Sequence, residues 1–142
     1  LQSVPGAAGP LANLLADEDP GIRKVAIFAL GQTRDRAAIP ALLPGLSDTS
    51  VEIRWNSALA LAVLGDPSGL GVLTQMIDRA HLDSIPGITE DQKTSAIING
   101  VQGLYLLKES SSIPRLTDLS VKDPSLKVRE VALKTIEELR PR

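Results

Sequence analysis

The chain has 142 residues, enough for one domain with its own core, and 43% of them are apolar, nearly all Leu, Ala, Ile and Val. Its 15 basic and 17 acidic residues are interspersed, so the net charge of -2 provides no basic surface for nucleic acid or an anionic membrane. The absence of cysteine excludes disulfides and thiolate sites, and no apolar run reaches the roughly 18 residues that a membrane span needs.

The first predicted elements form an incomplete helical pair and a complete one. Residues 10–17 predict the second helix of an incomplete unit. A long helix follows over residues 20–33, because apolar residues recur there at helical spacing. Pro20 suits its first position, where a missing backbone donor costs nothing. A shorter partner helix is predicted over residues 37–47.

The next predicted pair repeats the first. Its long helix covers residues 51–65 and its partner covers residues 68–79. Seven positions recur 31 residues later: Arg23, Ala26, Leu30, Asp35, Ile39, Leu42 and Leu46 correspond to Arg54, Ser57, Leu61, Asp66, Leu70, Leu73 and Ile77. A fixed period of this length is typical of helical hairpins that stack and share a core.

Residues 79–88 interrupt the period and contain helix breakers, so we predict an insertion that loops out. Insertions in repeat proteins often serve recognition. His81, the one histidine, lies in this insertion beside Asp83. The pair has the chemistry for acid–base catalysis or metal ligation, but metal sites usually recruit three or four ligands, which favours a solvated loop residue.

The last predicted elements are long helices over residues 90–108 and 124–139, with a partner helix over residues 112–120 between them. A Thr-x-x-Gln capping box precedes the first of these helices. Gly100 and Gly103 fall inside that helix, where they favour a close helix approach over phosphate binding. N-caps are predicted at Asp19, Ser50 and Ser125, at equivalent positions before three of the long helices.

The stretches 17–31 and 47–67 resemble short HEAT repeats of the type named after phycobilisome lyases (PBS lyase). They carry the Asp, Val-Arg-like, Ala, Ala-Leu and Gly-Asp-Pro features of that pattern, and the resemblance covers most of residues 8–139. It implies an all-α fold, a right-handed α-α superhelix (solenoid) of about four HEAT-like hairpins. We expect a single domain over residues 1–142 that is part of a longer chain, with further repeats before residue 1 or self-association through the open end.

The spacing Asp-x5-Arg occurs three times in one register. The pairs are Asp17 with Arg23, Asp48 with Arg54, and Asp123 with Arg129. The resemblance implies a ladder between adjacent units, in which each guanidinium bridges a carboxylate or a helix end. Because the pair recurs while a catalytic constellation appears once, we interpret it as structural.

Proteins of this kind include scaffolds, lyase subunits, metal-dependent hydroxylases and alkylpurine DNA glycosylases. The hydroxylases need paired His-Glu steps, which this chain lacks. We therefore predict no enzyme, with no catalytic, cofactor or metal site, and a non-catalytic scaffold that presents a concave helical surface to a protein or peptide. Nucleic acid and membrane insertion are not expected. The alternatives are a lyase-type or other enzyme subunit built on HEAT repeats, or a structural spacer.

Trp55 is the residue we single out for contact with a partner, because its register positions in other units carry charged residues. The favoured interpretation is nevertheless that its indole packs inside the protein, because aromatic residues are buried on average. The short helices are expected to line the concave wall. The predicted partner-binding residues are Trp55, Thr74, Gln75, His81, Arg115 and Asp118.

Overall fold

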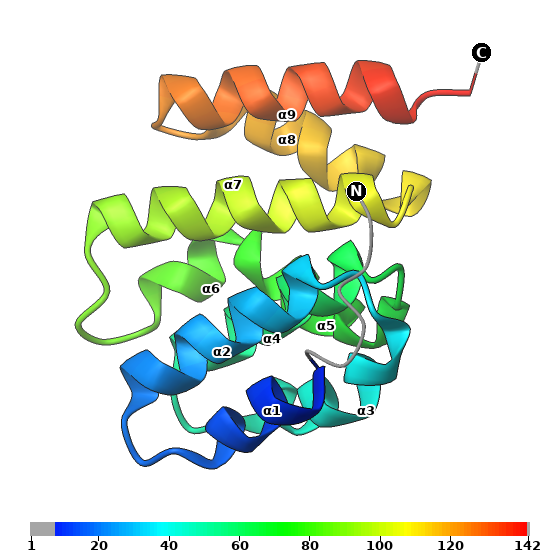
Figure 1. Cartoon of the computed structure of the whole chain (residues 1–142). Helices are drawn as coiled ribbons and strands as arrows, with labels where there is room; N and C mark the ends of the chain where they lie inside the picture. Colours follow the sequence, from blue (N-terminus) through cyan, green and yellow to red (C-terminus); the bar gives the residue numbers. More distant parts are fainter. Residues whose placement is uncertain (1–7, 142) are drawn as a thin grey trace. The chain divides into compact units, whose positions relative to one another are not determined.

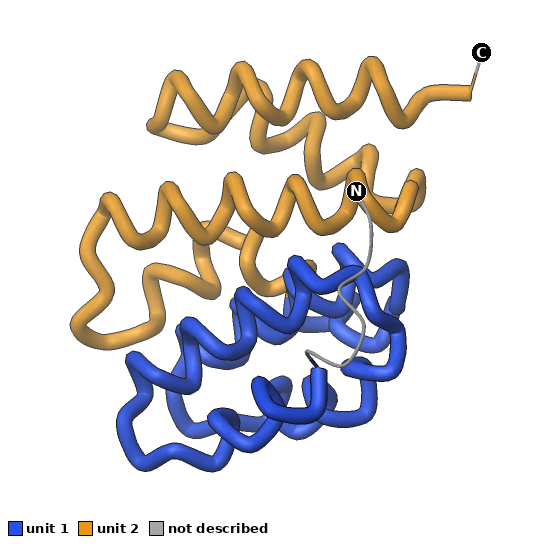
Figure 2. The backbone as a smooth tube through the Cα atoms, viewed as in Figure 1, with its two compact units in different colours: residues 1–72 blue, residues 73–142 orange. Residues whose placement is uncertain are grey.

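The computed structural model describes residues 8–141, which are helical with no strand among them (Figure 1). They divide into two compact units, residues 1–72 and residues 73–142 (Figure 2). Division into compact units is expected of repeat arrays, because each repeat contacts only its neighbours. The single domain predicted from the length therefore stays a prediction.

Unit 1 alternates long helices with short, irregular ones. Its helical elements are α1 (Ala8–Asn13), a 3-10 turn (Leu14–Ala16), α2 (Pro20–Gln32), a 3-10 turn (Arg36–Ala38), α3 (Ile39–Leu42), a 3-10 helix (Leu43–Ser47), α4 (Val51–Val63), a 3-10 turn (Pro67–Gly69) and the start of α5 (Leu70–Met76). The two long helices match the predicted ones to within two residues. The predicted partner helix over 37–47 is broken into three pieces, because Pro40 and Pro44 remove backbone donors and collide with the preceding turn.

The start of α2 follows from its cap. The Asp19 carboxylate accepts a hydrogen bond from the Gly21 N–H at 2.8 Å, and Pro20 occupies the first helical position as predicted. Ser50 differs from the prediction, since its side chain does not cap α4. Its own N–H instead donates to the Asp48 carboxylate at 2.8 Å, so the acidic side chain stabilises this turn.

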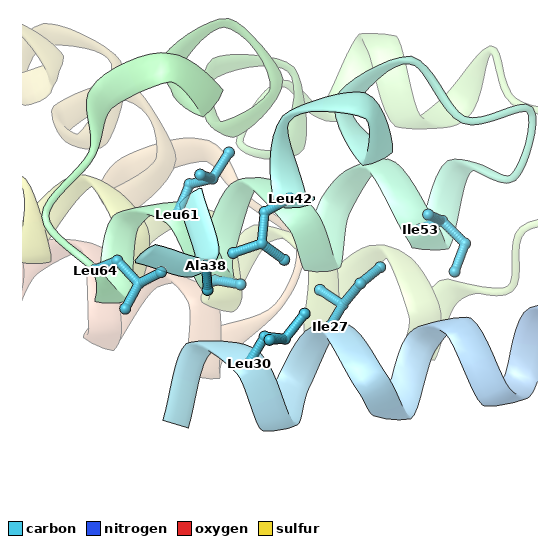
Figure 3. Close-up of a cluster of buried hydrophobic side chains, with 8 residues drawn as sticks. Ile27, Leu30, Ala38, Leu42, Ile53, Leu61 and Leu64 are labelled. Carbon is cyan, nitrogen blue, oxygen red and sulfur yellow. The ribbon is translucent and has the colours of Figure 1, made fainter. Parts of the chain in front are cut away.

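The core of unit 1 lies between α2, α3 and α4. Figure 3 shows Ile27 and Leu30 of α2 together with Leu42 of α3 and Leu61 of α4. These four side chains are at most 2% exposed, so they supply much of the hydrophobic stabilisation of the unit. Leu30, Leu42 and Leu61 are among the positions that recur at the 31-residue period, whereas Ile27 is not.

Unit 2 contains the end of α5 and the remaining helices. These are α6 (Arg79–Asp83), α7 (Glu90–Leu106), a 3-10 turn (Ser110–Ser112), α8 (Ile113–Lys122) and α9 (Leu126–Leu139). The capping box before α7 is present, with the Thr89 hydroxyl accepting from the Gln92 N–H and the Gln92 side chain accepting from the Thr89 N–H. Ser125 caps α9 as predicted, by accepting from the Val128 N–H.

The close helix approach predicted at Gly100 and Gly103 is confirmed within unit 2. A methyl group on Gly100 would lie 2.9 Å from the Met76 and Ile77 side chains, and one on Gly103 would lie 2.6 Å from the Leu73 side chain. Real Cβ atoms do not tolerate such distances. The glycines therefore let the backbone of α7 pack against the end of α5.

The insertion predicted to loop out over residues 79–88 does so only in part. Its first five residues form α6, whose Leu82 is fully buried. The Asp78 carboxylate accepts from the His81 N–H at 3.3 Å and caps this helix. Sequence reasoning missed α6 because one buried leucine and a cap make too short a pattern to reveal a helix.

Candidate functional site

The Asp–Arg pairs of unit 1 hold the turns before the long helices. The Arg23 guanidinium donates through Nη1 to the Asp17 carbonyl at 2.9 Å, and its Nε lies 3.6 Å from the Asp48 carboxylate of the next repeat. Arg54 donates through Nη1 to the Asp48 carbonyl at 2.7 Å. The role of these pairs as a structural ladder, which the resemblance implied, stays a prediction.

In unit 2 the ladder has a different donor. Arg129 donates to the Asp123 carbonyl at 2.8 Å, in the expected register. The Asp123 carboxylate is 0% exposed, and Arg79 of α6 forks onto it with Nη2 at 2.9 Å and Nε at 3.2 Å. Burial alone lowers the pKa of Arg79, but hydrogen bonding to Asp123 and the charges of Asp123 and Glu90 outweigh it and raise the pKa. Arg79 lies in the insertion, so the repeat register offered no signal for it.

A second cluster ties the insertion to α7. The Lys93 ammonium lies 2.8 Å from the Glu90 carboxylate and 2.9 Å from the Asp83 carboxylate. Hydrogen bonds to Glu90 and Asp83 raise the pKa of Lys93. With Arg79 also 3.0 Å from Glu90, two cations hold both ends of α6.

Unit 2 contains a groove of about 520 Å³, which we call the unit 2 groove. It is lined by Ile77, Asp78, Arg79, Ala80, Pro114, Arg115, Asp118 and Leu119. The buried side chains of Ile77 and Leu119 make its floor apolar. Charged groups surround this floor, which is the usual composition of a binding groove.

Three of the four charged side chains that line the groove already have partners within the protein. Arg79 is engaged by Asp123, and Asp118 pairs with Lys122 at 2.7 Å, where the Asp118 hydrogen bond raises the pKa of Lys122. Asp78 caps α6. Arg115 is exposed and makes no hydrogen bond or ion pair within the described part of the chain. Its guanidinium is the cation of the groove that remains open to a ligand.

The predicted partner-binding residues are only partly brought together. Arg115 and Asp118 line the groove, whereas Thr74 and Gln75 of α5 and His81 of α6 do not. Sequence reasoning missed Asp78 and Arg79, which line it from the insertion.

Trp55 requires a correction. It lies in α4 and is only 9% exposed, so it is not the exposed anchor of the first hypothesis. The favoured interpretation, a packed indole, fits the structure. The register argument failed because a large aromatic ring reaches buried surface from a position where Lys or Glu would reach solvent.

A metal of the kind used by His-Glu hydroxylases does not fit these residues. The chain has one histidine, and residues 8–141 hold no group of three or more His, Asp or Glu side chains that would bind a metal ion. Across the same residues, no helix is long and apolar enough to cross a membrane.

Known proteins similar to this chain include deoxyhypusine hydroxylases. The chicken (Gallus gallus) protein is 31% identical over 134 residues, which is 93% of this chain and 42% of that protein. The cattle (Bos taurus) protein is 38% identical over 82 residues, or 53% of this chain and 27% of that protein. The chain thus spans less than half the length of the curated relatives it matches.

Among solved structures, the complex of CpcE and CpcF of phycocyanin lyase from Nostoc is similar in fold. The match has a TM-score of 0.67 and 22% identity, and it covers 93% of this chain and 52% of that chain. At this identity the likeness shows the fold alone. It agrees with the predicted PBS lyase type of repeat.

The relatives correct two predictions, the non-catalytic scaffold and the absence of enzyme function. They are named as enzymes, so the alternative of an enzyme subunit built on HEAT repeats fits better than a scaffold. The prediction failed because the missing His-Glu steps describe this chain alone, whereas the relatives are more than twice as long as the matched stretch.

HEAT repeats match residues 8–85, which is more than half of the chain. The all-α solenoid class of HEAT-like hairpins predicted from the sequence is confirmed. This chain belongs to the HEAT-repeat family.

Proposed function

We propose that this chain is the HEAT-repeat part of an enzyme of the deoxyhypusine hydroxylase type, and that it binds the polypeptide that carries the reacting residue. The observation that carries this proposal is the similarity to the chicken hydroxylase over 134 residues. A stretch of that length in a chain of 142 residues has to include the unit 2 groove. The likeness to the lyase complex concerns the fold and does not favour a lyase.

The unit 2 groove supplies the binding surface. Its floor of Ile77 and Leu119 can accept apolar side chains of a peptide, and its lining comes mainly from α6 and α8. Arg115 also lines the groove, and its guanidinium makes no hydrogen bond or ion pair within the described residues. Since guanidinium groups pair with carboxylates, we expect an acidic side chain of the substrate polypeptide to contact Arg115.

The described residues bind and orient the substrate in this proposal, and the groups that perform the hydroxylation come from outside them. We separate substrate binding from catalysis because the one histidine of this chain is too few for a paired His-Glu metal site. Such a division is consistent with the chain matching 42% of the chicken protein.

The test uses a polypeptide that contains deoxyhypusine and the full-length protein. Binding is measured by fluorescence anisotropy, and hydroxylation is measured as the mass gain of one oxygen atom. Arg115→Gln should weaken binding about tenfold, because a charge-assisted hydrogen bond contributes about 1.5 kcal/mol or more. Lys127→Gln removes an exposed cation of α9 outside the groove and is the matched control.

Two outcomes are decisive. If the full-length protein neither binds nor hydroxylates the polypeptide, the proposed function is wrong. If it hydroxylates the polypeptide while Arg115→Gln and Lys127→Gln both bind like the wild type, the activity stands and the groove is not the binding surface. Circular dichroism confirms that both variants are folded.

A further inference from the structure

A small hollow in unit 1 lies beside the ladder between Arg23 and Asp48. It has a volume of about 100 Å³. Its lining is apolar except at three side chains, those of Arg23, Asp48 and Ser57. The hollow thus brings a cation, a carboxylate and a hydroxyl together inside the first repeats.

Two polar atoms in this lining are buried without a hydrogen-bond partner. They are Nε of Arg23 and the hydroxyl oxygen of Ser57. The Asp48 carboxylate lies 3.6 Å from the Arg23 Nε, which suffices for an ion pair but is too long for a hydrogen bond. Because buried polar groups in folded proteins are nearly always hydrogen-bonded, both atoms call for a partner.

The other repeats show that this arrangement is local. Asp123 occupies the position that corresponds to Asp48, and it receives a direct two-pronged contact from Arg79 of the insertion, at 2.9 and 3.2 Å. Ala26 and Ala132 occupy the positions that correspond to Ser57, and both are buried. The hydroxyl therefore occurs in the repeat where the carboxylate and the guanidinium are held apart.

The absence of a side chain at Gly45 leaves room for the Ser57 hydroxyl. A side chain on Gly45 would collide with the Ser57 hydroxyl, whereas glycine leaves room for it. The neighbouring 3-10 helix, Leu43–Ser47, brings this glycine against α4. The backbone is thus shaped around a polar atom that has no protein partner.

We propose that this hollow is a binding site for a small cluster of ordered water that completes the Arg23–Asp48 ladder. At roughly 30 Å³ for each molecule, the volume holds about three waters. Water accepts from the Arg23 Nε–H and donates to the Asp48 carboxylate, and the Ser57 hydroxyl does either. An anion would be repelled by Asp48, a cation would be repelled by Arg23, and an apolar molecule would satisfy neither.

The first test is a high-resolution crystal structure of the full chain. We expect water density within hydrogen-bond distance of the Arg23 Nε and the Ser57 hydroxyl. An empty hollow, or an Arg23 side chain in direct hydrogen-bond contact with Asp48, would overturn the proposal.

The second test asks whether the melting temperature rises or falls when the Ser57 hydroxyl is removed. If water bridges Ser57, the Ser57→Ala variant loses that bridge, so its melting temperature falls by a few degrees. If the hydroxyl is unsatisfied or bonds its own helix, removing it leaves the melting temperature unchanged or raises it, and the proposal fails.

Ala132→Ser is the matched control, because it places the same hydroxyl at the equivalent position of α9, where Asp123 is already directly paired. We expect its melting temperature to fall, since Ala132 is 0% exposed and an added hydroxyl at this position would be buried. A rise in the melting temperature of Ala132→Ser would show that serine is favourable at this register without water, which contradicts the proposal.

Discussion

Neutralising Asp123 should destabilise unit 2 strongly, since its carboxylate is 0% exposed and accepts three hydrogen bonds. Two come from Arg79, at 2.9 and 3.2 Å, and one comes from the Ser125 N–H at 2.9 Å. Breaking a buried ion pair from one side costs about 3–5 kcal/mol. Arg79 is 18% exposed and keeps its contact with Glu90, so we expect the lower end of this range, about 3 kcal/mol for Asp123→Asn.

The assay is a double-mutant cycle of Asp123→Asn with Arg79→Met, followed by urea denaturation and far-UV circular dichroism. We expect a coupling energy of about 1–3 kcal/mol between the two side chains. The comparison cycle uses Lys122→Met and Asp118→Asn, a pair whose side chains are 75% and 61% exposed. Solvent and salt screen such a pair. Equal coupling in the two cycles would refute the reasoning that burial makes the Arg79–Asp123 contact strong.

Two further predictions concern glycines and acid stability. Gly100→Ala and Gly103→Ala should each lower the free energy of unfolding by about 1–3 kcal/mol, because the added methyl group overpacks α7 against α5. Gly71 has open space around it, so Gly71→Ala is the control and should not destabilise the protein. Urea denaturation measures all three variants, and a Gly103→Ala variant more stable than the wild type would contradict the close approach. Hydrogen bonds from the Ser68 hydroxyl and N–H hold the pKa of Asp66 below its ordinary value of 3.8. The carboxylate therefore stabilises the fold above that pH and loses this contribution as the pH falls through the folded-state pKa. Asp66→Asn keeps a residue that can cap the turn but removes the titrating carboxylate. We therefore expect the free energy of unfolding of this variant to fall less steeply below about pH 4 than that of the wild type. The same pH dependence in both proteins would count against a lowered pKa of Asp66.

Much of the fold is encoded locally and was predictable for that reason. Helical stripes, N-caps and the 31-residue recurrence indicated α2, α4, α7 and α9 and the type of repeat. The glycines of α7 indicated a close helix contact. Each of these signals depends on residues within one hairpin or on its periodic copy.

The candidate site was predicted less well, because it depends on contacts that follow no period. Arg115 and Asp118 were identified, but the groove also needs Asp78 and Arg79 from the insertion. Nothing in the register pairs Arg79 with Asp123, which lies 44 positions away. The prediction of a non-catalytic scaffold was wrong as well, because the relatives that the chain matches are named as enzymes.

Periodicity and capping act over a few residues, so they were enough to predict stacked helical hairpins with a repeated Asp–Arg pair. The folded protein was needed to show that α6 supplies the partner of Asp123 and that Ser57 lines a polar hollow beside Arg23, and to establish that Trp55 is buried. These outcomes depend on how side-chain volumes and charges from different turns fill a shared space. That packing is a property of the assembled helices, and no single helix carries it.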